Sequence, residues 1–192
     1  MVSQSASSSF KVCESIIPGC LLLQPKRLED CRGYFVKTFH QPSFKEMGLE
    51  TDFSESFYSV SKKGVIRGMH FQSPPRDHVK LVYCANGAVQ DVVLDIRIGS
   101  PTYGHFDLFE LSAAKDNILY LPKGLAHGFC ALTDQTLVVY QVSEPYSPEY
   151  DRGIRWDSIG IPWEESTPLV SDRDKRHPVL SDFSSPFVYD LS

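Results

Sequence analysis

The fold class is decided by one stretch, residues 63–95, which reads KGVIRGMHFQSPPRDHVKLVYCANGAVQDVVLD. It holds three apolar segments separated by turn residues at Pro74-Pro75 and Asn86-Gly87. Short β-branched segments between such turns predict strands. The strand-like segments of this stretch also carry Arg67, His70, His78 and Lys80. If the chain is an enzyme, we expect its base and its anion-binding groups here.

The same pattern continues outward from this stretch. We expect strands near residues 20–23, 32–39, 52–60, 65–72, 78–84, 88–97, 104–111, 117–121, 127–131 and 136–143. Asn86-Gly87 is the strongest signal for a two-residue β-hairpin. The one expected helix covers residues 41–48, where Pro42 suits the first turn and Gly48 suits the C-terminal cap. Many short strands with one helix predict an all-β sandwich or barrel.

Length and composition predict one folded domain with appended ends. Residues 1–10 are rich in serine and are expected to be disordered, residues 11–165 form the domain, and residues 166–192 form an irregular C-terminal arm. A net charge of −5 argues against nucleic-acid and anionic-membrane partners. Five widely spaced cysteines indicate reduced thiols, and no signal peptide or membrane span is visible, so we expect a cytoplasmic protein.

The histidines raise the question of a metal site. His70, His78 and His127 flank glycines or turns on expected strands, whereas the other three are expected to be exposed or structural: His40, His105 and His177. The pattern Pro122-x-Gly124-x-x-His127 resembles the second motif of cupin barrels. The first cupin motif supplies an HxH pair and a glutamate, but His70 has no second histidine two residues on. We therefore expect no catalytic metal.

Without a metal, these residue types suit proton transfer at carbon. A histidine can abstract a proton next to a carbonyl, and arginine and lysine can stabilise the enolate oxygen. A tyrosine on the other face can return a proton. This combination is coherent for an epimerase, although many barrels contain the same residue types.

The order of motifs resembles a known family. The segments are RGMHFQ (67–72), KLVYC (80–84), GAVQDVVLDIR (87–97), SPTYG (100–104), LPKGLAHGF (121–129), YSP (146–148), GIRWDSIGIPW (153–163) and SDRD (171–174). In collinear order, from about Gln24 to Asp174, they closely resemble the dTDP-4-dehydrorhamnose 3,5-epimerases. The resemblance implies a cupin-type jelly roll, or double-stranded β-helix, whose C-terminal arm closes the site.

The resemblance also implies a substrate, an assembly and residue roles. The implied protein is a homodimer that needs no metal or cofactor. It epimerises a nucleotide-linked 4-keto-6-deoxyhexose for surface polysaccharide, such as O-antigen lipopolysaccharide, or for a glycosylated product. His70 would accept the proton, oriented by Asp174, and Tyr140 would donate one, while Lys80 and Arg67 stabilise the enolate. The implied substrate-binding residues are Arg32, Lys37, Glu55, Phe57, Arg67, Lys80, His127, Asp151 and Arg173. Arg32 and an N-terminal segment would reach across to the dimer partner.

Two local expectations follow from strand geometry. In a regular strand Arg67 and His70 point to opposite faces, so a shared site requires an irregularity, which we expect at Gly68. Asp91 shares a face with Val89, Val93 and Asp95, and it either lies buried near a site histidine or faces solvent.

The chain also departs from the family pattern. Lys37 stands where members usually carry glutamate, and Glu55-Ser56-Phe57 replaces a Gln-x-Asn pair. The nucleotide (dTDP, CDP, UDP or GDP) therefore stays open. So does a single-position C-3 epimerase acting on a different nucleotide. A third alternative is a non-catalytic cupin that binds a sugar nucleotide, although the intact His70 and Tyr140 speak against it.

Overall fold

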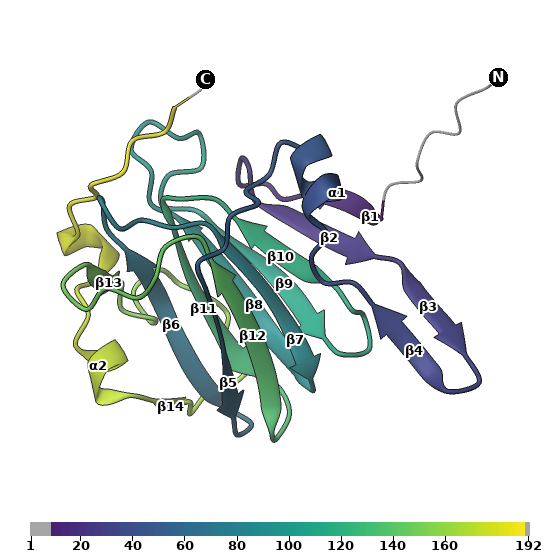
Figure 1. The fold of residues 1–192 in the computed structure, drawn as a ribbon. Coiled ribbons are helices and arrows are strands. Elements are labelled where there is room, and N and C mark those ends of the chain that lie inside the picture. The colour runs from purple at the N-terminus through teal and green to yellow at the C-terminus, as the bar shows by residue number, and fades with distance from the viewer. Residues whose placement is uncertain (1–8, 191–192) are drawn as a thin grey trace.

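Two β-sheets packed face to face form the body of the computed structural model, which describes residues 9–190 (Figure 1). The first sheet has the order β1-β2-β10-β7-β12-β5. Its strands are β1 (Phe10–Glu14), β2 (Leu21–Pro25), β10 (Ile118–Leu121), β7 (Lys80–Asn86), β12 (Thr136–Val142) and β5 (Glu55–Ser61). The second sheet has the order β13-β6-β11-β8-β9, with β14 beside β6. Its strands are β13 (Asp151–Gly153), β6 (Val65–Gln72), β11 (Leu125–Ala131), β8 (Ala88–Asp95), β9 (Phe106–Ser112) and β14 (Leu169–Val170). This arrangement confirms the predicted all-β, jelly-roll class.

The second sheet carries core residues on both of its faces, and a further cluster around Phe44 of α1 (Gln41–Glu46) covers the outer face of the first sheet. Between the sheets, Val82 and Val138 of the first pack with Val93 and Phe129 of the second. On the outer face of the second sheet, Met69, Phe71, Val92 and Leu94 are covered by later parts of the chain, including Ile154 and Phe187. This explains why β8 is buried along nearly its whole length, whereas β12 alternates between buried and half-buried residues. Strands buried on both faces lose the alternation of apolar and polar residues.

The predicted hairpin at Asn86-Gly87 is wrong. The strands on either side of it, β7 and β8, belong to different sheets, so this turn carries the chain from one layer to the other. The local expectation of positive φ does hold, at +79° for Gly87. A Cβ there would lie 2.1 Å from Thr133 Oγ1, so the crossing also depends on glycine for space.

The N-terminal part contains more strands than predicted. β1 was not expected, and it pairs with β2 beginning at Phe10, a buried residue inside the range predicted to be disordered; residues 1–8 of that range lie outside the described residues. In place of one strand over residues 32–39, β3 (Arg27–Asp30) and β4 (Gly33–Val36) form a separate hairpin. This hairpin extends away from the two sheets (Figure 1).

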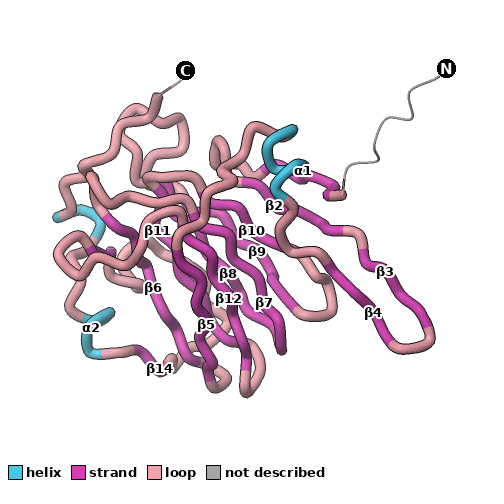
Figure 2. The backbone as a smooth tube through the Cα atoms, in the orientation of Figure 1, coloured by secondary structure: helices cyan, strands magenta, loops and turns pink. Residues whose placement is uncertain are grey.

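Short helices and turns complete the described chain (Figure 2). The predicted helix is confirmed as α1 (Gln41–Glu46), with proline in its first turn and Gly48 at a φ of +70° just beyond its end. The C-terminal segment is mostly loop, with α2 (Asp172–Lys175) and a 3-10 turn, η1 (Leu180–Asp182). None of the described helices has the length and apolar character needed to span a membrane.

Candidate active site

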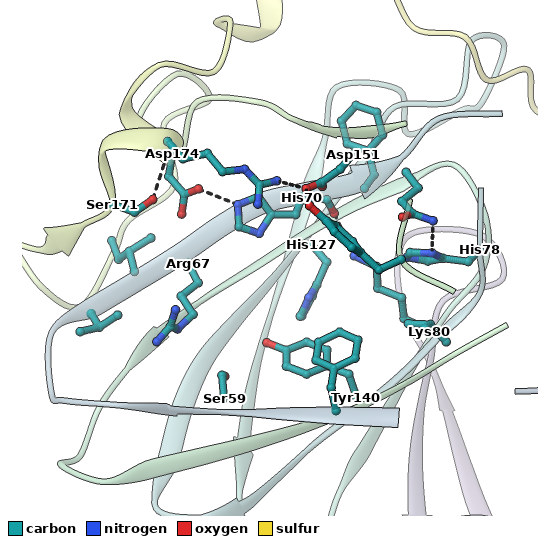
Figure 3. Close-up of a pocket in the computed structure, with 18 of the residues that line it drawn as sticks. Ser59, Arg67, His70, His78, Lys80, His127, Tyr140, Asp151, Ser171 and Asp174 are labelled. Carbon is teal, nitrogen blue, oxygen red and sulfur yellow. Dashed lines mark hydrogen bonds and ion pairs between the residues drawn. The ribbon is translucent and has the colours of Figure 1, made fainter. Parts of the chain in front are cut away.

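A cavity of about 580 Å³ opens between the edge strand β5 and strand β6. Its lining comes from both sheets and from the segment around α2 (Figure 3). Ten of the twelve predicted site residues line it: Glu55, Phe57, Arg67, His70, Lys80, His127, Tyr140, Asp151, Arg173 and Asp174. Residues far apart in the sequence thus share one pocket, as the resemblance implied.

His70 on β6 is paired with Asp174 on α2. His70 Nε2 lies 2.7 Å from Asp174 Oδ1, and the Gly68 amide donates to Asp174 Oδ2 at 3.2 Å. Burial opposes ionisation of Asp174, but the hydrogen bonds from His70 and Gly68 outweigh it and lower the pKa of the carboxyl. Since an ionised carboxylate can only accept, Nε2 of His70 carries the proton and Nδ1 keeps a free lone pair.

The predicted irregularity at Gly68 is confirmed. The pairing of β6 with β11 shifts register between His127 and Phe129, and Gly68 has a φ of +151°. A Cβ at Gly68 would lie 2.6 Å from the Cα of Gly128, so only glycine fits between these strands. As a result Arg67 and His70 both face the cavity.

Tyr140 on β12 approaches the cavity from the side opposite His70 (Figure 3). Its ring stacks on Phe57 with centroids 4.9 Å apart, and it meets His127 edge-on at 6.0 Å. Burial, with a contribution from Asp91, raises the pKa of Tyr140 above its ordinary value. The hydroxyl is therefore held in its protonated form.

Asp91 is buried beside a site histidine. Of the two alternatives left open by the sequence, a buried carboxylate or a solvent-facing one, the first is therefore correct. Both of its carboxylate oxygens lie 2.9 Å from His127 Nε2. Neither side chain is accessible, with exposed fractions of 4% for His127 and 0% for Asp91. Burial raises the pKa of Asp91, and the nearby His127 and Lys80 counteract it.

Two cationic side chains face the same space. Lys80 Nζ donates to the backbone carbonyl of His70 at 3.0 Å, and burial lowers the pKa of Lys80 to about 8. Arg67 is bonded through Nε to Ser61 Oγ at 3.1 Å, on the neighbouring edge strand β5. These cations are available to stabilise negative charge that develops in the cavity.

The rim of the cavity is a polar network. Arg173 forms an ion pair with Asp151 at 2.7 Å, and the hydroxyl of Tyr146 donates to the same carboxylate at 3.1 Å. Glu55 accepts a hydrogen bond from the backbone amide of Tyr146 at 2.6 Å. The carboxylate that replaces the usual amide of the family pattern is thus engaged with the rim.

Two predicted site residues do not line this cavity. Arg32 lies at the turn between β3 and β4, where it pairs with Asp30 and has a side chain that is 86% exposed. Lys37 follows β4 and is also exposed. Within one chain, therefore, the protruding hairpin separates Arg32 and Lys37 from the other site residues.

Sequence reasoning missed several residues of the site. Ser59 lines the cavity, and the period-2 alternation of β5 after Glu55 and Phe57 is the signal that would have found it. His78 also lines the cavity; burial, then Lys80 and Lys123, lower its pKa to about 3. His177, expected to be exposed or structural, lies against the His70–Asp174 pair, and no pattern in the sequence signals this.

The arrangement fits proton transfer at a carbon next to a carbonyl. A histidine with a free ring nitrogen faces a protonated tyrosine across one cavity, and cations lie beside them. Among the described residues, one group has the side chains to hold a metal ion, and it consists of His70, Asp174 and His177.

Comparison with known proteins points to the same chemistry. Residues 14–182 match the family model described as dTDP-4-dehydrorhamnose 3,5-epimerase. A Shigella flexneri protein of that name is 43% identical over 168 residues, covering 86% of this chain and 93% of the relative. A Streptomyces niveus protein named dTDP-4-dehydrorhamnose 3-epimerase is 37% identical over 169 residues, covering 86% of this chain and 82% of the relative.

A solved structure extends the similarity to three dimensions. The Legionella pneumophila dTDP-6-deoxy-D-glucose-3,5-epimerase, determined in complex with dTDP-4-keto-L-rhamnose, superimposes with a TM-score of 0.90 at 30% identity. The superposition covers 94% of this chain and 100% of the Legionella chain.

Proposed function

The chain belongs to the dTDP-4-dehydrorhamnose 3,5-epimerase family, and on this premise we propose that it epimerises a nucleotide-linked 4-keto-6-deoxyhexose with His70 as the base. One observation carries the proposal: the His70–Asp174 pair and Tyr140 face one cavity from opposite sides (Figure 3). The relatives named 3,5-epimerases favour inversion at both C-3 and C-5.

Each epimerisation takes two proton transfers. Nδ1 of His70 removes the proton from the carbon next to the C-4 ketone, and the electrons of the C–H bond move onto the ketone oxygen. Lys80 and Arg67 stabilise the resulting enolate, which is the electrostatic contribution that matters most in such reactions. Tyr140 returns a proton to the opposite face of the carbon, and the ketone re-forms. The substrate's own ketone acidifies the C–H bonds.

Solvent deuterium incorporation tests this function. The protein is incubated in heavy water with dTDP-, CDP-, UDP- and GDP-4-keto-6-deoxyglucose, and products are analysed by mass spectrometry and proton NMR. We expect exchange at C-3 and C-5 with one nucleotide. Exchange at C-3 alone would replace the double epimerase with a single-position enzyme, as in the Streptomyces niveus relative by its name. Binding without exchange would support a non-catalytic sugar-nucleotide-binding protein.

The changed residues on β5 make the comparison of nucleotides essential. Phe57 is stacked on Tyr140, and Glu55 is engaged with the backbone of Tyr146, so neither offers the amide groups usual in the family pattern. A site that is built to hydrogen-bond one ligand discriminates strongly against another that lacks the matching group. The nucleotide preference of this chain should follow these two positions.

A homodimer completes the proposal. The β3–β4 hairpin exposes Leu28, Tyr34 and Phe35 to between 51% and 56%, an apolar surface that suits contact with a second copy. Such a contact would bring Arg32 and Lys37 to the partner's pocket. Analytical ultracentrifugation at micromolar concentration is expected to give a dimer, and a Tyr34→Asp/Phe35→Asp double variant a monomer. A monomeric wild-type chain would contradict this part of the proposal.

Location in the cytoplasm is the last part of the proposal. All five cysteines are free, although three of them are buried: Cys20, Cys84 and Cys130. Free thiols are typical of reducing compartments. Fractionation of cells that express the chain, followed by immunodetection, checks the location.

A further inference from the structure

We propose that His70, Asp174 and His177 form a zinc-binding site that reversibly switches off the base, an inference that rests on the proposed role of His70. The ligand atoms of the three side chains lie within 4.8 Å of one another. His70 Nε2 lies 2.7 Å and His177 Nε2 3.8 Å from the same oxygen, Asp174 Oδ1. Two imidazoles and a carboxylate form a ligand set that zinc uses in proteins, with a fourth position left for water.

The buried nitrogen of His177 supports this assignment. His177 Nε2 has no hydrogen-bond partner among the described residues, and at 3.8 Å it is too far from Asp174 to form one. Buried ring nitrogens usually have a partner, so this atom calls for a ligand. A metal ion between His177 and Asp174 would supply it.

The His177 ring occupies space that is open only because residue 153 is glycine. The His177 ring packs against Gly153 of β13, where a Cβ would lie 2.5 Å from Nε2. The same ring meets His70 edge-on, with centroids 5.7 Å apart. Both rings therefore approach Asp174 Oδ1 from fixed directions, which is the preorganisation that a metal site requires.

The distances suit a zinc ion after small side-chain movements. Zinc–nitrogen and zinc–oxygen bonds of about 2.0–2.2 Å place tetrahedral ligand atoms about 3.3 Å apart. The two distances to Asp174 Oδ1, 2.7 Å and 3.8 Å, lie on either side of that separation. Lengthening one and shortening the other brings all three atoms around one ion.

Zinc at this site disables His70 by changing its tautomer. In the metal-free protein the proton is on Nε2, donated to Asp174, and Nδ1 is free to act as the base. Zinc takes the Nε2 lone pair, so the neutral imidazole must carry its proton on Nδ1. No net proton is released from His70, but the nitrogen that faces substrate can no longer accept one. The sugar pocket stays open, so the turnover number should fall while KM stays nearly constant.

Calorimetry and deuterium exchange together test the proposal. Zinc chloride is titrated into the full-length protein carrying Cys13→Ser and Cys31→Ser, since these exposed thiols also bind zinc. We expect one zinc ion per chain by calorimetry. In the exchange assay we expect at least a tenfold fall in kcat, a less than threefold change in KM, and full recovery after addition of EDTA.

The decisive variant is His177→Gln, with His105→Gln as the matched control, because His105 is exposed and lies outside the cluster. Measured against its own metal-free exchange rate, His177→Gln should need at least tenfold more zinc for half inhibition. His105→Gln should behave as the parent. If His177→Gln does not fold by circular dichroism, His177→Asn takes its place. Calorimetry with Asp174→Asn, which should also bind zinc at least tenfold more weakly, tests the site independently.

Three results would overturn the proposal. These are equal zinc sensitivity of parent and His177→Gln, no zinc binding by calorimetry, and a rise in KM at constant kcat, which would place the ion in the sugar pocket. Calorimetry reads the site without turnover. If no sugar nucleotide exchanges deuterium, the proposed function fails, and so does the inhibitory role of the ion, whereas binding at the three residues is still decided by the variants.

Discussion

Two histidine–aspartate pairs of nearly equal length, each with its histidine lining the pocket, differ in their surroundings. His70 and Asp174 are 2.7 Å apart on the wall formed by β6 and α2, and the His70 side chain is 28% exposed. His127 and Asp91 are 2.9 Å apart between the sheets, and the His127 side chain is 4% exposed. The pKa of Asp174 is lowered by its hydrogen bonds, whereas burial raises that of Asp91.

Under the proposed mechanism, pairing with a carboxylate does not by itself make a histidine a base. Asp174 is fixed by the Gly68 amide, and its own amide is capped by Ser171 Oγ at 3.1 Å, so it can hold His70 in one tautomer while the ring faces the cavity. Asp91 gives both of its oxygens to His127 deep in the sheet. We therefore expect the first pair to control turnover and the second to control stability.

The largest effect should come from His70→Ala. Loss of the base should lower the deuterium-exchange rate by about 10³-fold or more, within the range for general-base catalysis. Exchange is measured by NMR at saturating substrate, with nucleotide-sugar affinity measured separately by calorimetry. His105→Ala, on an exposed loop, is the control. Exchange retained within tenfold would remove His70 from the role of base.

Asp91→Asn should act mainly on stability, whereas His70→Ala acts mainly on the exchange rate. Asparagine keeps one acceptor oxygen for His127, but it removes the charge and the second oxygen from a fully buried pair, which should cost about 3 kcal/mol. Urea unfolding followed by fluorescence gives the free energy of unfolding. Asp157→Asn removes one side of an exposed ion pair and should cost less than about 1 kcal/mol. Equal losses of unfolding free energy in Asp91→Asn and Asp157→Asn would contradict a stabilising role for the buried pair.

Asp174→Asn should act mainly on the rate. The asparagine amide can donate to Nε2 of His70 and favour the tautomer with the proton on Nδ1, so exchange should slow on the order of 10²-fold. The neighbouring Asp172, whose side chain is 88% exposed, provides the matched control Asp172→Asn. Rate and unfolding free energy are measured on both variants. A large loss of stability with an unchanged rate would assign Asp174 the role given to Asp91.

His78 is a third histidine of the pocket and differs from His70 and His127 in having no carboxylate partner among the described residues. Its pKa is lowered to about 3 by burial, and further by Lys80 and Lys123. Its pKa in the folded state lies below the unfolded value of 6.5, so the unfolded chain binds more protons as the pH falls. Stability from this residue is complete above pH 6.5 and is lost as the pH falls towards 3. Between pH 6.5 and pH 5 the loss should reach about 2 kcal/mol. In His78→Gln the free energy of unfolding, measured with urea, should depend less on pH over that interval than in the parent. The same pH dependence in both proteins would argue against a neutral, buried His78.

The sequence predicted those features of the fold and the site whose residue pattern lies close to them in the chain. The strand at residues 65–72 and the break at Gly68 follow from β-branched residues, from period-2 geometry and from a glycine between two site residues. The helix at residues 41–48 follows from Pro42 and Gly48. These signals lie within a few residues of the structure that they specify.

Distant contacts were beyond the reach of local patterns. A two-residue turn has the same signature whether its strands pair or diverge, so Asn86-Gly87 did not reveal that β7 and β8 belong to different sheets. The prediction of which face of β8 carries Asp91 was correct. Whether Asp91 is buried depended on which other strands pack against that face. The contact of His177 with the His70–Asp174 pair depends on the path of a loop-rich segment, which has no periodicity to read.

The position of Asp174 after both sheets has a consequence for biosynthesis. Strand β12, the last long strand of the first sheet, ends at Val142, and every strand that forms the two layers apart from β13 and β14 has been translated by then. Asp174, whose carboxylate is paired with His70, is translated later. A nascent chain can therefore assemble most of its β-layers while His70 still lacks its carboxylate partner, so under the proposed mechanism full turnover begins only after Asp174 has been translated.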